Sequence, residues 1–408
     1  METSLLEIVR CPFCGTRLTV VENAALVRSG SEIDSGVLGC ECCAYPIVDG
    51  IPVMIANDRV REAMHQLEDG HRDAALYTLL ELEGDRRDAF RAFRARDNGT
   101  YREGLKILSV DAEAEYFVYR FSDPTFRVAR AVVLATGPTL QRGGRYIDLC
   151  GGSGHLVRTM VSDHRAVLAD VYFWKLWLAK TFVAPYCEPV CCDANSPLPF
   201  ARDTFSLVVL SDAFPYIWHK RLLAEEMMRL AGADGTIVMP HLHSALGENF
   251  SAGMPLTPAA YHDLLQPQHP RMYRDSALLD DVLKGSIDLS RDEPPEALAG
   301  EPALVIVASH HEEIFRTVAL PDVVPAPDAV IVNPLYRIEV RGDESRLTLT
   351  FPTPEYEEEF AAVKRYLPSS VTIPGDVRRG IDVAAVGQER YAELCRNLVL
   401  LAAPERYA

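Results

Sequence analysis

The residues that decide the fold are Asp148-Leu149-Cys150-Gly151-Gly152-Ser153-Gly154. They follow the apolar pair Tyr146-Ile147 and precede helix-like residues that begin at His155. An apolar strand, a glycine turn and a helix in this order are typical of the first turn of an open α/β sheet, where backbone N–H groups face a ligand. Because glycine turns also occur without a ligand, the residues further along the chain decide the interpretation.

Acidic residues end the next two apolar runs. Asp170 follows Asp148 by 22 positions and ends the run 166–169, where a carboxylate can accept two hydrogen bonds from ribose hydroxyls. The third run, 189–192, leads into Asp193 and Ala194. The segment Leu198-Pro199-Phe200 then precedes a fourth apolar run that begins near Phe205.

This series resembles the class I S-adenosylmethionine-dependent methyltransferases over about residues 126–243. The resemblance implies an α/β fold with a Rossmann-like sheet and S-adenosyl-L-methionine as the cofactor. It implies that the turn, with Asp148, Cys150, Gly151, Gly152 and Gly154, flanks the methionine part of the cofactor. Asp170 would bind the ribose, and Asp193, with Ala194 beside it, would contact the adenine.

Two positions depart from the family pattern. Cys150 stands where the first glycine of the turn is usual, and Ser206 replaces the acid of the fourth strand. One alternative is therefore a sheet that has lost its ligand and acts as a scaffold. A nicotinamide cofactor is a second alternative, but Asp193 and the segment 198–200 favour the sulfonium donor.

Near the N-terminus, two C-x-x-C pairs predict a structural zinc site. The pairs are Cys11 with Cys14 and Cys40 with Cys43, and Cys42 is a spare thiol beside the second pair. Four thiolates close a tetrahedral ion completely and leave no position for water, so this zinc is expected to stabilise a small fold rather than to catalyse. The alternative is a chance set of free cysteines.

The sequence around these cysteines resembles small zinc-ribbon proteins that activate tRNA, rRNA and release-factor methyltransferases. After the second pair, Tyr-Pro-Ile-Val-Asp-Gly-Ile-Pro at 45–52 has a hairpin signal at Asp49-Gly50. The resemblance covers about the first 55 residues. It implies a ribbon fused to its own client enzyme.

Composition and charge limit the partners of the chain. The net charge of -17 over 408 residues, and a ribbon with three arginines against seven acids, argue against nucleic acid as a partner. We see neither a signal peptide nor an apolar run of about 18 residues, so we expect a cytoplasmic protein without a membrane span. The cysteine usage fits a reducing compartment.

The catalytic candidates follow the fourth and fifth predicted strands, where substrates approach an open α/β sheet. Asp212 follows the fourth strand, and His241 and His243 follow the fifth. We expect these side chains to face the acceptor, with one histidine acting as a base where a proton must leave. Capping or core histidines are the alternative, and two histidines at i, i+2 are only weak evidence for a second metal. The three tryptophans are expected in the core or at an interface.

Four parts of the chain are expected. These are the ribbon at 1–57, a helical linker or cap at 58–125, the methyltransferase domain at 126–320 with an insertion near 250–302, and a C-terminal α+β extension at 321–408. We expect 303–309 and 314–320 to form a closing hairpin, a second hairpin around Gly342-Asp343, and helices at 355–366 and 388–401. The extension would adapt the enzyme to its substrate or to a second copy in a homodimer.

The leading hypothesis is a methyltransferase that acts by O- or N-methylation on a small molecule, a lipid or a saccharide intermediate. A second hypothesis is an RNA or protein methyltransferase that uses the ribbon to bind its substrate or partner. A third is a non-catalytic scaffold with a degenerate pocket, which Cys150 and Ser206 suggest.

Overall fold

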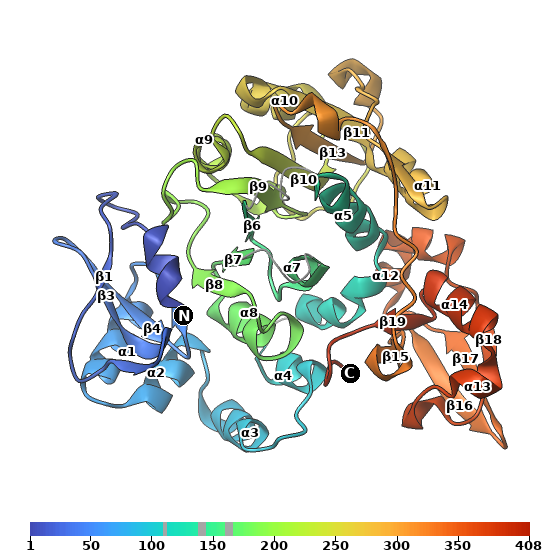
Figure 1. The fold of residues 1–408 in the computed structure, drawn as a ribbon, viewed down its shortest axis with the longest axis horizontal. Coiled ribbons are helices and arrows are strands. Elements are labelled where there is room, and N and C mark those ends of the chain that lie inside the picture. Colours follow the sequence, from blue (N-terminus) through green and yellow to red (C-terminus); the bar gives the residue numbers. More distant parts are fainter. Residues whose placement is uncertain (109–111, 138–143, 160–165) are drawn as a thin grey trace.

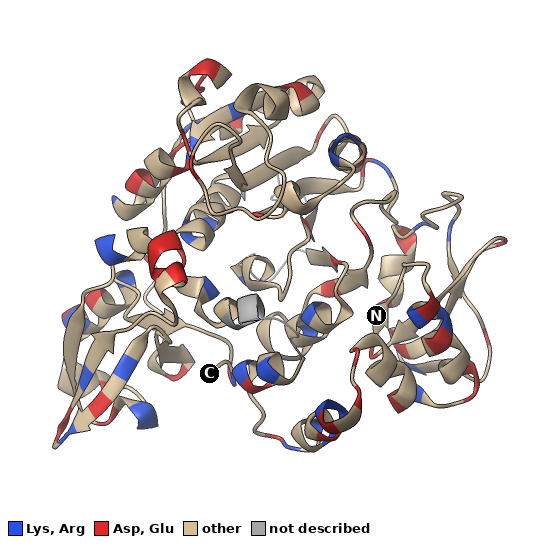
Figure 2. Cartoon of the chain, turned by 180° about the vertical axis from the view of Figure 1, so that it is seen from behind, with Lys and Arg blue, Asp and Glu red and all other residues tan. Residues whose placement is uncertain are grey.

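A central sheet lies between an N-terminal ribbon and a C-terminal α+β unit (Figure 1). The computed structural model describes residues 1–108, 112–137, 144–159 and 166–408. Among them, no helix has the length and apolar character needed to cross a membrane. Lys and Arg are interspersed with Asp and Glu along the ribbon and the helices that follow it (Figure 2).

The central sheet has seven strands in the order β11-β13-β10-β9-β6-β7-β8. Their bounds are β6 (Arg145–Leu149), β7 (Ala166–Asp170), β8 (Glu188–Cys191), β9 (Phe205–Leu210), β10 (Thr236–His243), β11 (Pro270–Arg274) and β13 (Ala303–Ala308). Strands β6 to β10 are parallel, and β13 is antiparallel to both β10 and β11. The order reverses between β6 and β9, which is where ligands bind in open α/β sheets. This topology confirms the expected class I methyltransferase sheet.

Helices cover both faces of this sheet, as its continuously apolar parallel strands require. One face packs against α5 (Pro124–Ala135), α7 (His155–Thr159), α8 (Phe173–Leu178) and α11 (Asp275–Leu283). The other face packs against α9 (Lys220–Ala231) and α10 (Pro258–Leu265). Parts of the ribbon belong to both cores.

The antiparallel edge of the sheet differs from the expected hairpin. Strand β13 pairs with β11, not with the residues that follow it, because η7 (Glu312–Ile314) turns the chain away from the sheet. The next strand, β14 (Thr317–Ala319), pairs instead with β12 (Ser286–Asp288). Part of 250–302, which the sequence indicates as an insertion, thus supplies β11 to the central sheet.

The ribbon is built from short antiparallel strands. They are β1 (Thr19–Val20), β2 (Val27–Ser29), β3 (Glu32–Gly39), β4 (Ala44–Val48) and β5 (Ile51–Pro52), preceded by η1 (Thr3–Glu7). The hairpin predicted between β4 and β5 is confirmed, and its turn residues Asp49 and Gly50 have φ values of 48° and 70°. Positive φ at both central positions is the requirement of a type I′ turn, which Asp-Gly satisfies.

The ribbon continues the edge of the central sheet beyond β8. Val53 forms a parallel bridge with Cys191, and the N–H of Met54 donates to the carbonyl of Cys191 at 2.7 Å. The turn also docks on the helices behind the sheet, because Trp177 Nε1–H donates to Asp49 Oδ2 at 2.9 Å. The ribbon is therefore packed directly against the sheet and its helices.

The segment between ribbon and sheet is helical, as the sequence predicts, and consists of several short helices. It contains α1 (Asp58–Glu68), α2 (Arg72–Leu79), α3 (Gly84–Arg94), α4 (Tyr101–Leu108) and η2 (Ala112–Ser122). Gly70, with φ 80°, ends the first helix. Leu76 and Phe90 are buried in the core that also contains β6 and β7 residues, so this segment covers the sheet.

The C-terminal unit has its own core around a three-stranded sheet. Strands β16 (Tyr336–Arg341) and β17 (Glu344–Leu349) form the predicted hairpin, and β18 (Ser370–Pro374) completes the sheet. The predicted helix 388–401 is wrong at its end: α14 (Gln388–Arg396) stops early because β19 (Leu400–Ala402) pairs with β15 (Val330–Val332). The remaining helical turns are η3 (Ala179–Val183), η4 (Phe214–Tyr216), η5 (Gln266–Gln268), η6 (Pro295–Leu298), η8 (Pro327–Ala329), α12 (Pro354–Glu359), η9 (Ala361–Arg365), η10 (Val377–Arg379) and α13 (Val383–Val386).

Candidate functional site

The glycine turn after β6 is tight and contains a non-glycine residue in a left-handed conformation. Cys150 has φ 56°, a value that glycine adopts freely and cysteine rarely. At Gly151, a Cβ would lie 2.5 Å from Asp148 Oδ2, so no side chain fits between the turn and that carboxylate. Cys150 therefore has a side chain at a position whose backbone favours glycine. Gly151 must be glycine because the turn passes too close to Asp148 for a side chain.

Asp148, at the end of β6, carries an orphaned carboxylate. Its side chain is buried, and neither oxygen has a hydrogen-bond partner among the described residues. Burial, followed by the nearby charge of Asp170, raises the pKa of Asp148 to about 8. A buried carboxylate without partners is costly, so this position suits a ligand group that brings N–H donors or positive charge.

The two other predicted cofactor acids lie at the ends of neighbouring strands. Asp170 ends β7 and accepts hydrogen bonds from the N–H groups of Gly152 at 3.0 Å and Tyr172 at 2.9 Å. Asp193 lies beyond β8, next to the buried Ala194, and accepts from the N–H of Asn195 at 2.8 Å. The predicted cofactor residues thus lie along the carboxyl ends of β6, β7 and β8.

Two further side chains lie against the turn, and sequence reasoning missed both. Phe117, from η2, has a ring atom 3.6 Å from where a Cβ on Gly152 would be. The ammonium of Lys175, from α8, lies 5.1 Å from the centre of that ring and 4.6 Å from the Tyr172 ring. No motif marks Phe117, whereas Lys175 could have been suspected from its place five residues after the ribose acid.

The three catalytic candidates lie together beside the end of β9. His243 Nε2 is 3.4 Å from Asp212 Oδ1, and the rings of His241 and His243 are 4.9 Å apart. The register of β10 against β13 shifts between Met239 and Leu242, and His241 has φ 55°. The two imidazoles thus lie together at an irregular point of β10.

Charged neighbours set the electrostatics of this cluster. Burial alone would raise the pKa of Asp212, but the hydrogen bond from His243 and the positive charges of His241 and Arg120 lower it to about 2. Burial alone would lower the pKa of His241, but the Asp275 carboxylate, 3.4 Å from its Nδ1, raises it to about 9. Asp275 begins α11, and no sequence signal linked it or Arg120 to the site.

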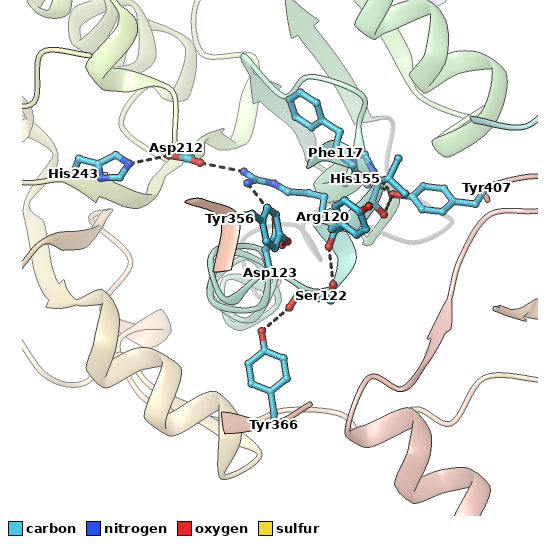
Figure 3. A network of polar contacts seen from close by, with 12 residues as sticks. Phe117, Arg120, Ser122, Asp123, His155, Asp212, His243, Tyr356, Tyr366 and Tyr407 are labelled. Carbon is cyan, nitrogen blue, oxygen red and sulfur yellow. Dashed lines mark hydrogen bonds and ion pairs between the residues drawn. The ribbon is translucent and has the colours of Figure 1, made fainter. Parts of the chain in front are cut away.

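The C-terminal unit holds Arg120 in place through a buried network (Figure 3). Arg120 lies 3.4 Å from Asp212 Oδ2 and 3.7 Å from Asp123 Oδ2. Tyr356, from α12, donates its hydroxyl to Asp123, and Tyr366 donates to the carbonyl of Ser122 at 2.5 Å. The extension therefore contributes to the site by positioning the segment that carries Arg120.

Exposed apolar side chains line the two loops beside the cluster. Tyr216 and Trp218 follow β9, and Leu246, Phe250 and Met254 follow β10. The loops are joined where the N–H of Met254 donates to the carbonyl of Pro215 at 2.8 Å. Trp174 and Trp177 are buried as expected, but Trp218 is 73% exposed, so the core interpretation is wrong for it.

The ribbon thiols form a group that contains three of the four predicted ligands together with Cys42. Ligand atoms of Cys11, Cys14, Cys40 and Cys42 all lie within 4.8 Å of one another. The sequence predicts Cys43 rather than Cys42; the Cys43 thiol lies 3.5 Å from the Cys42 thiol and, like that of Cys11, contacts the Tyr45 hydroxyl. The thiolate-donor chemistry of the group fits a zinc ion.

A comparison with curated proteins identifies the N-terminal part. It is 34% identical over 58 residues to a UPF0434 protein of Pseudoalteromonas translucida, covering 14% of this chain and 74% of that protein. Through its ribbon, the chain belongs to the UPF0434 family. The UPF0434 ribbon is thus joined in one chain to a class I methyltransferase sheet. No family model matches the chain.

Solved structures with distant likeness include methyltransferases. A SAM-dependent methyltransferase from Thermotoga maritima is 13% identical, with 48% of this chain and 93% of that chain covered and a TM-score of 0.32. A chain from the complex of the Haloferax volcanii Trm112 methyltransferase activator with a methyltransferase is 18% identical, with 44% and 84% covered and a TM-score of 0.30. The strand order, not these likenesses, identifies the fold.

Proposed function

We propose that the chain is an S-adenosylmethionine-dependent methyltransferase. The observation that carries this proposal is the orphaned Asp148 carboxylate beside the turn, at the point where the strand order of the sheet reverses. Asp148 and the turn 150–154 would hold the cationic methionine part, Asp170 the ribose, and Asp193 with Ala194 the adenine. When bound, the cofactor supplies a methyl group activated by its sulfonium.

The acceptor is proposed to be a small molecule, a lipid or a saccharide intermediate with an apolar part. The exposed side chains of Trp218 and Phe250 lie on the loops that follow Asp212 and His243. They offer apolar contact area beside the polar cluster, as ligand sites commonly do. The net charge of -17 also disfavours a polyanionic acceptor.

The protein groups would align the acceptor and exclude water, because the methyl group is already activated. Asp212, His241 and His243 would face the acceptor atom. Where an O- or N-nucleophile must lose a proton, a histidine of the cluster would accept it, and Asp212, 3.4 Å from His243, would stabilise the resulting imidazolium.

Cofactor binding is the first test. Calorimetric titration of the purified full chain with S-adenosylmethionine should give about one site per chain. Asp170→Ala should weaken binding at least about tenfold, since a hydrogen bond to a charged group contributes about 1.5–3 kcal/mol. Asp263→Ala, at an exposed position on α10, is the control. Absence of binding, or unchanged binding in Asp170→Ala, would contradict the proposal.

A second candidate function is an RNA or protein methyltransferase, which the UPF0434 ribbon favours. Phe13, beside Cys14, is 68% exposed and offers an apolar contact for a partner. Labelled donor would be incubated with the enzyme and cell extract, and the extract then fractionated. Label in small molecules or lipids supports our proposal, and label in RNA or protein favours this second function. Turnover of any acceptor removes the third candidate, a scaffold with a degenerate pocket.

A further inference from the structure

We infer that Asp212, His241 and His243 bind one divalent first-row transition ion, at a site separate from the ribbon cysteines. Ligand atoms of these three residues all lie within 4.8 Å of one another. Two imidazoles and one carboxylate form a donor set suited to Mn²⁺, Fe²⁺, Co²⁺ or Zn²⁺, whereas Mg²⁺ and Ca²⁺ prefer oxygen donors. Three protein ligands leave positions open for a further ligand.

His243 is buried and His241 is partly buried, and each ring has a nitrogen without a hydrogen-bond partner among the described residues. His243 is 7% exposed, and its Nδ1 has no hydrogen-bond partner among the described residues. Its Nε2 points at Asp212 (Figure 3). The two rings lie 4.9 Å apart, and His243 Nε2, the nitrogen that faces Asp212, is the one that an ion would bind.

Asp275 supplies the outer contact that metal-binding histidines usually have. Its Oδ1 lies at ion-pair distance, 3.4 Å, from His241 Nδ1, and neither atom has a hydrogen-bond partner in the described part of the chain. A carboxylate at Nδ1 holds the N–H there and leaves Nε2 as the basic nitrogen for an ion. Asp275 thereby fixes the tautomer and direction of His241.

The charges around the cluster are compatible with a bound cation, although the positive charge of Arg120 lies nearby. The guanidinium contacts Asp212 Oδ2, whereas His243 faces Oδ1, so the ion would lie on the opposite side of the carboxylate. Arg120 also pairs with Asp123 at 3.7 Å. Together with Asp275, the nearby carboxylates outnumber this one guanidinium.

Backbone strain is present at two of the three ligands. Asp212 has φ 57° and His241 has φ 55°, in the left-handed region that non-glycine residues enter at a cost. Such strain persists where the surrounding structure enforces it, often at functional sites. Here it directs side chains from β10 and from the loop after β9 toward one point.

The binding of the ion does not depend on the proposed function. Its role does rest on that function, because the ion would act on the acceptor of the methyl group. With positions left open, it would bind an oxygen of the acceptor and lower the pKa of its hydroxyl group, so that the proton leaves to water and the two histidines act as ligands in place of a base. The site therefore favours an acceptor that carries an alcohol or phenol oxygen, and O-methylation over N-methylation.

The test is to titrate Mn²⁺ into the full chain with its ribbon cysteines loaded with zinc. Binding is measured as the loss of the electron paramagnetic resonance signal of free Mn²⁺. The wild type should bind about one Mn²⁺ per chain. His241→Asn, His243→Gln and Asp212→Asn should each weaken binding at least about tenfold; asparagine tolerates the left-handed backbone at 241 and 212. Asp275→Asn should weaken it by about 10–100-fold through the outer contact. His262→Asn, on α10, is the matched control, and circular dichroism checks folding.

Absence of Mn²⁺ binding to the wild type, or unchanged binding in both His241→Asn and His243→Gln, would overturn the inference. Titration of the same samples with S-adenosylmethionine separates the two proposals. A chain that binds the donor but no Mn²⁺ contradicts only the metal site. A chain that binds Mn²⁺ at these residues but no donor contradicts only the proposed function.

Discussion

The hydroxyl of Tyr407 lies 2.8 Å from Nε2 of His155, the first residue of the helix that follows the glycine turn. It also donates to the carbonyl of Phe117 at 3.1 Å, so one side chain near the end of the sequence joins the turn helix to η2. Burial, with the charges of Arg120 and Arg158, lowers the pKa of His155 to about 3. The ring is therefore neutral near pH 7, and its Nε2–H donates to Tyr407.

Tyr407→Phe should destabilise the protein and loosen the turn. The substitution keeps the ring but leaves His155 Nε2–H and the Phe117 carbonyl without this partner, which costs about 1–3 kcal/mol in a buried site. Urea unfolding followed by circular dichroism measures the loss, and donor titration should show weaker binding. Tyr186→Phe removes an exposed hydroxyl that donates to the Arg158 carbonyl, and it should cost less. Equal costs in the two variants would argue against a special role for Tyr407.

Local sequence patterns predicted the elements better than their long-range contacts. The strand, turn and helix around Asp148 and the Asp49-Gly50 hairpin depend on residues close together in the chain, so spacing and turn chemistry sufficed. Arg120 reaches Asp212 across 92 positions, and Tyr356 reaches Asp123 across 233. No local pattern encodes such pairs, because they arise only when helices and sheets pack.

The predicted strand pairing at the sheet edge was wrong for the same reason. Strand β13 is a continuous apolar run, which indicates a buried strand but not its neighbour. Its partner β11 comes earlier in the chain, whereas the sequence suggested a hairpin with later residues. At the candidate site, spacing located Asp212, His241 and His243, but the irregularity in β10 and the contact with Asp275 required the structure.

Asp148→Asn should change how stability depends on pH. The folded-state pKa of Asp148 is about 8, above the unfolded value of about 3.9, so the folded state binds the proton more tightly. The resulting penalty is absent below about pH 4 and grows until about pH 8, to the order of 5 kcal/mol as an upper bound. The wild-type free energy of unfolding should therefore fall more steeply than that of Asp148→Asn between about pH 4 and pH 8.

Urea unfolding at several pH values measures this difference. Asp263→Asn, at an exposed position, should keep the wild-type slope. The same Asp148→Asn variant should bind S-adenosylmethionine less tightly, since the carboxylate is the proposed partner of the cationic methionine part. Parallel pH profiles for wild type and Asp148→Asn would show that Asp148 is not the group that titrates.

Cys150→Gly should stabilise the protein. A left-handed backbone costs a non-glycine residue about 1–2 kcal/mol, and the larger unfolded-state entropy of glycine offsets about 0.5–1 kcal/mol of that gain. A net increase of about 0.5–1 kcal/mol is expected at φ 56°. Cys150→Ala is the control, because it removes the thiol but keeps the strain. If alanine stabilises as much as glycine, the thiol rather than the backbone is the source of the cost.

The ribbon cysteines give a prediction in which two adjacent residues serve as test and control. The structure groups Cys42 with Cys11, Cys14 and Cys40, whereas the C-x-x-C spacing selects Cys43. Cys42→Ser should therefore lower bound zinc well below one ion per chain and lower the melting temperature, since a structural zinc contributes directly to folding. Cys43→Ser, whose thiol is not part of that group, should retain its zinc. Elemental analysis of both purified variants decides between them, and loss of zinc in Cys43→Ser alone would restore the ligand set that the spacing predicts.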